Sequence, residues 1–148
     1  GPVHHQTFAD PYDPVLRAAL VESSRAGGIE VHDGGTMVVV NGPRFSTRAE
    51  SRWYANQGWA VIGMTGHPEA ILAREMTLCY STVCLVTDHD AGVDEASAVS
   101  VDAVFEVFAA HTDTLKSIMR DVIGALGTER DCSCSHAVDG MPLPIALP

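Results

Sequence analysis

The sequence has few basic residues and no long apolar run, and both shortages exclude classes of function. Its 148 residues include 9 Lys and Arg against 19 Asp and Glu, which gives a formal net charge of −10. Such a surface does not suit nucleic acid or an anionic membrane, because phosphate groups are bound by basic side chains. No apolar segment approaches the ~18 residues of a membrane span, and no basic segment followed by an apolar one suggests a secretory signal. We therefore expect a cytoplasmic protein.

Common nucleotide-binding and hydrolase motifs are also absent. The sequence contains no P-loop, no dinucleotide-binding fingerprint and no nucleophile elbow. Cysteine is scarce, and two of the four, Cys79 and Cys84, lie in an apolar stretch that predicts buried thiols. Cys132 and Cys134 do not have the C-x2-C spacing of zinc sites, and the sequence has no second pair. We therefore predict no metal site.

The composition indicates one folded domain. A hydrophobic fraction of 46% with 19% charged residues is typical of a well-packed α/β protein. The chain begins with Gly-Pro-Val-His-His-Gln rather than Met. Gly-Pro is compatible with a protease scar, but the next residues run directly into structured sequence, and we interpret the chain as the C-terminal part of a longer one. We expect a core over residues 1–130 and an irregular, Pro-rich tail over residues 131–148.

Capping signals and apolar periodicity predict alternating helices and strands. Asp13-Pro14 and the capping box of Thr47 and Glu50 mark helix starts, and Ser100 caps the longest helix. This alternation predicts an α/β fold with a mixed, largely parallel sheet flanked by helices. The expected elements are helices from Pro14 to Gly27, from Thr47 to about Gln57, from Pro68 to Glu75 and from Ser100 to Gly127, a hairpin of Val31 and 36–40 with 33–35 as its turn, and strands over 60–63 and 81–86.

Asp88 and Asp90 follow the predicted strand 81–86, which is continuously apolar like a central parallel strand. Alternate side chains of an extended chain face the same way, so both carboxylates could enter one pocket. They could then accept from the amino group of adenine and, when protonated, donate to its N7. A turn in which an Asp caps the loop is an equally good interpretation. An Asp-His-Asp metal site is a weaker third one.

Two other loops also follow predicted strands. In the first, Phe45 could stack on a planar base, and Ser46, with free N–H groups before a helix, could bind an oxyanion. In the second, Met64 could line an apolar sugar pocket and Thr65 could bind phosphate or a ribose hydroxyl. Plain helix capping by the hydroxyl side chains competes with both hypotheses.

Taken in order, these segments resemble the purine nucleoside phosphorylase superfamily, and more closely its methylthioadenosine phosphorylase branch. The matching blocks lie at 42–50, 64–69, 73–75, 79–80, 87–90 and 98–101. The resemblance implies a nucleoside phosphorylase-type α/β fold and reversible phosphorolysis of an N-glycosidic bond by inorganic phosphate. It also implies no metal or organic cofactor, and a homotrimer or homohexamer. The two carboxylates favour a 6-amino base, since the related 6-oxopurine enzymes use an Asn there.

The resemblance also assigns roles to single residues. Asp88 would protonate N7 of the leaving base, and Asp90 would bind its amino group. Phe45 and Met64 would contact the base and the ribose. The other implied site residues are Ser46 and Thr65 near ribose or phosphate, Thr87 beside the base, Val101, Val104 and Phe105 in an apolar 5′ pocket, and His5 on an arm that reaches a neighbouring subunit's site.

The function expected on these grounds is phosphorolysis of S-methyl-5′-thioadenosine to adenine and 5-methylthioribose 1-phosphate. Two alternatives stay open. One is a purine nucleoside phosphorylase of broader specificity. The other is a non-catalytic fragment, because the family's N-terminal half supplies most phosphate ligands and is not in this sequence. Cys132-Ser-Cys134 resembles the paired-cysteine tail of some heat-stable members, which would allow a disulfide there.

Overall fold

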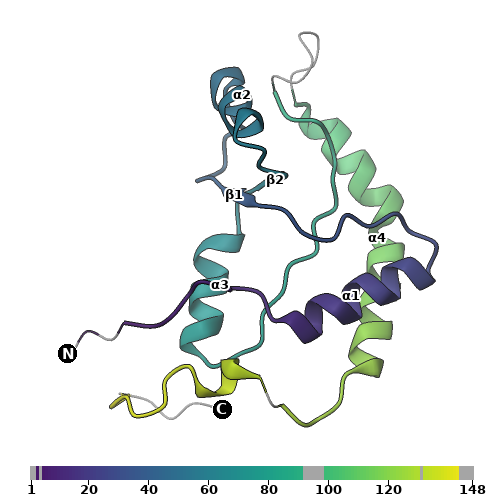
Figure 1. The fold of residues 1–148 in the computed structure, drawn as a ribbon. Coiled ribbons are helices and arrows are strands. Elements are labelled where there is room, and N and C mark those ends of the chain that lie inside the picture. The colour runs from purple at the N-terminus through teal and green to yellow at the C-terminus, as the bar shows by residue number, and fades with distance from the viewer. Residues whose placement is uncertain (1–2, 4, 92–98, 131, 144–148) are drawn as a thin grey trace.

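The computed structural model describes residues 3, 5–91, 99–130 and 132–143 of the chain. Helices and strands alternate along it, and the two strands form a parallel sheet. Figure 1 shows α2 above this small sheet, α3 below it, and α1 crossing α4 at its side. In order, the elements are α1 (Pro14–Ala26), β1 (Met37–Val39), α2 (Arg48–Asn56), β2 (Val61–Gly63), α3 (Gly66–Glu75), α4 (Val101–Ala125) and the short 3-10 helix η1 (Ser133–His136).

Side-chain caps determine where three of the helices begin. Asp13 precedes α1 and accepts a backbone N–H of its first turn at 2.8 Å. At α2, Thr47 and Glu50 form the predicted capping box, in which each side chain accepts the other residue's backbone N–H. At α4, the Ser100 hydroxyl accepts the backbone N–H of Ala103. These oxygens satisfy N–H groups that a helix start leaves unpaired, and the three predicted helix starts are confirmed.

The predicted hairpin is wrong, because β1 pairs with β2. The two strands are parallel, in a register that places Met37 beside Val61 and Val39 beside Gly63. A parallel pair needs a long crossover, and α2 provides it. Residues 31–36 form no strand. Pairing two short apolar runs removes apolar surface of both from water. Val31 lies between polar Glu30 and His32 and provides no such run.

The predicted central strand over 81–86 is also wrong. This segment runs from the end of α3 past the sheet toward α2 (Figure 1), and it makes no ladder with β1 or β2. A strand requires backbone partners, which the described residues do not provide here. Val83 and Val86 are 40% and 60% exposed, and Cys84 is exposed rather than buried as predicted. Much of this apolar run is therefore exposed.

The buried side chains form a small core. α4 packs against α1 and contributes Ile118 and Val122 to it. Other apolar residues of α4 are less covered, and Phe105 is 67% exposed. Within the predicted irregular tail, η1 brings Cys134 into the buried set. The buried apolar residues are Tyr54, Ala70, Ala73, Ile118, Val122, Cys134 and Val138. Among the helices in the described ranges, none is both long and apolar enough to cross a membrane.

Candidate active site

A cavity of about 380 Å³ opens beside the carboxyl ends of the two strands. Its walls come from β2, from the loop that follows β1, from α2 and from residues 84–90. The carboxyl edge of parallel strands is where open α/β sheets bind small ligands. Most of the side chains predicted for the site line this cavity: Phe45, Ser46, Met64, Thr87, Asp88, Asp90 and Val104.

Asp88 and Asp90 reach the cavity through a turn. The backbone of Asp90 has a φ of 58°, in the left-handed region that Asp tolerates better than most residues, and its N–H donates to Asp88 Oδ1 at 2.8 Å. The Thr87 hydroxyl donates to Asp88 Oδ2 at 2.7 Å. The chain is therefore not extended here, and the turn in which an Asp caps the loop, one of the two interpretations left open, is present. Both side chains nevertheless line the cavity.

Ser51 is a cavity residue that sequence reasoning missed. It is only 3% exposed, and its hydroxyl donates to Asp90 Oδ2 at 2.5 Å. The contact orients the carboxylate, and within the described residues Asp90 Oδ1 has no hydrogen bond. One signal could have indicated Ser51, because it lies one helical turn before the buried Tyr54 and so places a hydroxyl on the inner face of α2.

An apolar and aromatic wall completes the cavity. Phe45 and Met64 come from the loops after β1 and β2, and the buried ring of Tyr54 joins them from α2. Gly42 permits this arrangement, since a Cβ there would lie 2.8 Å from Met64 Sδ. An apolar and aromatic wall in a cavity that also has carboxylates suits a planar base that carries hydrogen-bond donors.

Arg44 does not line the cavity. Its guanidinium donates two hydrogen bonds to Glu50, at 2.7 and 2.8 Å, and so supports the capping box of α2. The cap is Thr47 rather than Ser46, which leaves Ser46 at the cavity wall. Within the described part of the chain, the cavity lining contains no Lys or Arg. His89 is the one basic side chain of the described lining, so an anion bound here would need Lys or Arg from elsewhere.

The Arg44–Glu50 pair makes part of the stability depend on pH. Hydrogen bonds from Arg44, with those from the backbone and hydroxyl of Thr47, hold the pKa of Glu50 at about 2, below its usual 4.5. Because the folded-state pKa is lowered, the stabilisation is present above pH 4.5 and is lost as the pH falls toward 2. We expect Glu50→Gln to reduce the loss of unfolding free energy between pH 6 and pH 3, measured by urea unfolding with circular dichroism.

The matched control for this experiment is Glu106→Gln, at an exposed position of α4. The control should keep the pH dependence of the wild-type protein. If Glu50→Gln also keeps it, the pair does not cause the dependence.

The other predicted site residues do not line the cavity. Thr65 is exposed and makes no side-chain cap at α3, although it stands at the cap position. Val101 and Phe105 at the start of α4 are 52% and 67% exposed. His5 is exposed near the N-terminus. Of the predicted apolar 5′ pocket, Val104 alone is a cavity residue.

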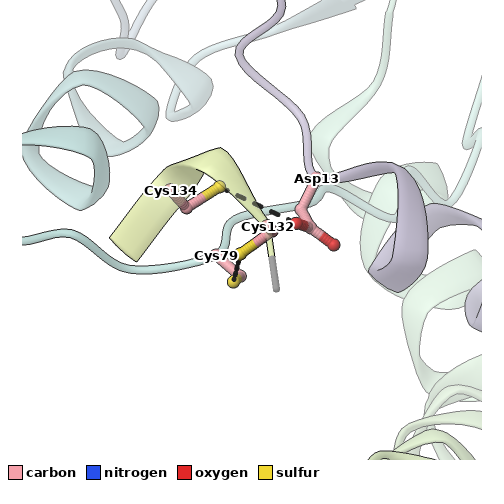
Figure 2. Close-up of side chains that lie close together, drawn as sticks. All are labelled: Asp13, Cys79, Cys132 and Cys134. Atoms are coloured by element: carbon pink, nitrogen blue, oxygen red, sulfur yellow. Dashed lines mark hydrogen bonds between the residues drawn. The ribbon is translucent and has the colours of Figure 1, made fainter. Parts of the chain in front are cut away.

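A second group of chemically active side chains lies apart from the cavity. It gathers where the start of α1, the segment after α3 and the C-terminal η1 meet, and consists of Asp13, Cys79, Cys132 and Cys134 (Figure 2). None of the four lines the cavity. Local spacing in the sequence could not reveal this group, because Cys79, which lies beside Cys132 in the structure, precedes it by 53 positions.

Comparison with known sequences gives consistent matches. The family model described as the phosphorylase superfamily matches residues 1–123. A purine nucleoside phosphorylase from Streptomyces coelicolor is 53% identical over 148 residues, which cover 99% of this chain and 53% of that protein. An S-methyl-5′-thioadenosine phosphorylase from Mycobacterium tuberculosis is 50% identical over 145 residues, which cover 97% of this chain and 53% of that protein.

Solved structures agree with the sequence matches. A double mutant of adenosine/methylthioadenosine phosphorylase from Schistosoma mansoni, in complex with adenine, matches with a TM-score of 0.84 and 31% identity, over 93% of this chain and 54% of that one. A single mutant of the same enzyme in complex with methylthioadenosine matches with a TM-score of 0.79 and 30% identity, over 93% and 52%. The predicted α/β fold is confirmed. The chain spans about half the length of the relatives it matches.

Proposed function

The chain belongs to the phosphorylase superfamily, and on that premise we propose that the whole protein catalyses the reversible phosphorolysis of S-methyl-5′-thioadenosine. The products are adenine and 5-methylthioribose 1-phosphate. Inorganic phosphate is the co-substrate, and the reaction uses no metal or organic cofactor. The relatives of about 50% identity act on purine nucleosides according to their names, which supports this class of substrate.

The cavity at the carboxyl ends of the strands is the observation that carries the proposal. Its lining combines the carboxyl groups of Asp88 and Asp90 with apolar side chains that include Phe45 and Met64. Adenine fits this pairing of surfaces, since its flat ring is apolar while its amino group and N7 lie on one edge. Asp90, oriented by Ser51, would accept from the amino group through its Oδ1. Asp88 would then face N7.

The chemistry follows from these positions. Phosphate attacks C1′ while the bond from C1′ to N9 of the base breaks, and positive charge develops on the ribose. Protonated Asp88 donates its proton to N7, so that adenine leaves as a neutral base and Asp88 becomes a carboxylate. Holding both reactants in register lowers the entropic part of the barrier, and the proton transfer stabilises the departing electron pair.

Phosphate needs cationic ligands, and His89 is the single basic side chain in the described cavity lining. Ser46 at the wall and the exposed Thr65 offer hydroxyls, but a dianion requires more positive charge than one His can supply. We infer that the other cationic groups come from the remainder of the protein or from a neighbouring subunit in a homotrimer or homohexamer. His5, exposed on the N-terminal arm, is the residue of this chain that we assign to such a neighbour's site.

Val104 should determine the preference for a methylthio group over a 5′-hydroxyl. An apolar side chain leaves a buried hydroxyl without a partner, which costs roughly 1–3 kcal/mol. We expect Val104→Asn to lower the ratio of kcat/KM for methylthioadenosine to that for adenosine by about 5–100-fold. The measurement is steady-state kinetics with both nucleosides.

Val107→Asn is the matched control, since it lies one turn further along α4 and does not line the cavity. Its ratio should equal that of the wild-type protein. An unchanged ratio for Val104→Asn would remove Val104 from the 5′ pocket.

A purine nucleoside phosphorylase of broader specificity is the second candidate. It is favoured by the 53% identity to the Streptomyces coelicolor enzyme, whose name carries no methylthio preference. The two candidates differ in one measurable quantity, the relative kcat/KM for methylthioadenosine, adenosine and inosine. A methylthioadenosine phosphorylase prefers the first, whereas the broader enzyme accepts inosine well.

The direct test is release of adenine from methylthioadenosine by the whole protein, with and without phosphate. Release that depends on phosphate supports phosphorolysis, whereas release without phosphate would indicate a hydrolase. If the whole protein releases nothing from any purine nucleoside, the enzymatic proposal is wrong and the non-catalytic alternative holds. The 148-residue chain, assayed alone beside the whole protein, then shows whether the remaining part supplies the phosphate ligands.

A further inference from the structure

We propose that one zinc ion binds where the start of α1, the segment after α3 and η1 meet. This site lies outside the nucleoside cavity and is independent of the reaction proposed there. Its four ligands are the thiolates of Cys79, Cys132 and Cys134 and the carboxylate of Asp13 (Figure 2).

The spacing of the four ligand atoms suits one tetrahedral ion. With Zn–S bonds near 2.3 Å, neighbouring sulfurs of a tetrahedral site lie about 3.8 Å apart. Cys79 Sγ and Cys132 Sγ are 3.3 Å apart, and Cys134 Sγ lies 3.7 Å from Asp13 Oδ2. All four atoms lie within 4.8 Å of one another. Side-chain shifts of about an ångström or less would therefore bring them to bonding distance.

The carboxylate of Asp13 supplies a reason for a cation to be there. Asp13 is 3% exposed and Cys134 is 5% exposed, and a buried carboxylate is costly without a compensating charge. Among the described residues Asp13 forms no ion pair. Its Oδ1 accepts the N–H of Leu16 and caps α1, while Oδ2 faces the thiols. One oxygen can thus hold the helix while the other binds the metal.

Two hydrogen bonds around the site hold its segments together before any ion arrives. The Asp13 N–H donates to the carbonyl of Tyr80 at 2.7 Å, which joins the start of α1 to the residue after Cys79. Arg130 Nη1 donates to the carbonyl of Thr77 at 3.1 Å, which joins the chain just before Cys132 to the same segment. A site assembled in advance loses less entropy when the ion binds.

The ligand set selects the kind of metal. Three thiolates are soft ligands that favour zinc over magnesium or calcium, which prefer oxygen. Four protein ligands leave no open position, as in zinc sites that support structure rather than catalysis. Binding replaces three S–H protons by one Zn²⁺ and releases the three protons to solvent, with no change of oxidation state. The ion would join the C-terminal tail to α1 and to the segment after α3.

The test uses the whole protein, reduced and stripped of metal, and titrates it with cobalt(II) and then zinc. We expect one equivalent of cobalt to give the thiolate charge-transfer band and the intense visible bands of tetrahedral cobalt, and one equivalent of zinc to abolish them. Cys132→Ser and Cys79→Ser should each weaken binding by at least about 10–100-fold, the loss that even outer-shell changes produce. Cys84→Ser is the control, because this exposed cysteine lies outside the group, and it should bind as the wild-type protein does.

Three results would overturn the proposal. The first is a reduced wild-type protein that gives no tetrahedral cobalt spectrum, and this measurement does not depend on any variant's folding. The second is that Cys84→Ser and Cys132→Ser weaken metal binding equally relative to the wild-type protein. The metal would then be bound by cysteines nonspecifically. The third is a disulfide among Cys79, Cys132 and Cys134 in the native protein, found by peptide mass, together with no metal binding after its reduction.

Discussion

Replacing Asp88 by alanine is expected to lower the turnover of methylthioadenosine by about 10²–10⁴-fold, the usual contribution of a positioned general acid. Without its proton the adenine must leave as an anion, so the bond to C1′ breaks far more slowly. The fold should survive, because Asp88 is an exposed residue of the loop after residue 86. Steady-state kinetics measures the turnover, and circular dichroism shows whether the fold is kept.

An N7-methylated substrate makes this prediction specific. Its base already carries a positive charge and leaves without protonation, so Asp88→Ala should slow its cleavage much less than that of methylthioadenosine. Asp113→Ala, at a side chain on α4 that is 98% exposed, is the control for the loss of one carboxylate. If Asp88→Ala slows the cleavage of both substrates by the same factor, Asp88 does not act as the acid at N7.

Asp90→Asn is expected to shift the preference from 6-amino to 6-oxo purines. A carboxylate can only accept a hydrogen bond, whereas an amide can also donate one to O6 of hypoxanthine. A mismatched buried pair costs roughly 1–3 kcal/mol, so the ratio of kcat/KM for adenosine to that for inosine should fall by about 5–100-fold. Ser51 can still donate to the Oδ1 of an asparagine, which keeps the side chain oriented as it is in the wild-type protein.

Asp113→Asn controls for the charge change at a distance from the cavity, and its ratio should stay that of the wild-type protein. An unaltered ratio for Asp90→Asn would show that residue 90 does not contact the substituent at C6. Another cavity residue would then determine the preference between 6-amino and 6-oxo purines.

The features that could be predicted from the sequence depend on near neighbours. The cap of α1 by Asp13 and the capping box of Thr47 and Glu50 involve groups three residues apart, and the apolar spacing of α4 repeats along one helix. Such interactions are the same whatever the rest of the chain does. For this reason the helix starts, and the α/β alternation that they define, are confirmed.

The features that could not be predicted depend on distant partners. β1 pairs with β2 across a helix instead of with Val31, its partner in the predicted hairpin. Residues 81–86 have a strand-forming composition, but they form no ladder among the described residues. Ser51 contacts Asp90 across 39 positions. Local patterns in a single sequence do not indicate which of several similar apolar runs will meet, so the pairing and the turn at Asp90 appear only in three dimensions.

The hydrogen bond from Ser51 to Asp90 joins α2 to the carboxylate that we propose binds the base. Binding of a base there and the stability of α2 would then be parts of one equilibrium. A base that holds Asp90 in place also favours the state in which α2 is folded, because Ser51 reaches Asp90 only from the intact helix. Nucleoside binding should then slow amide hydrogen exchange along α2, including amides on the face away from the cavity. Conversely, fraying of a nine-residue helix would weaken affinity for a base that touches few of its residues, so the length and caps of α2 set part of the affinity.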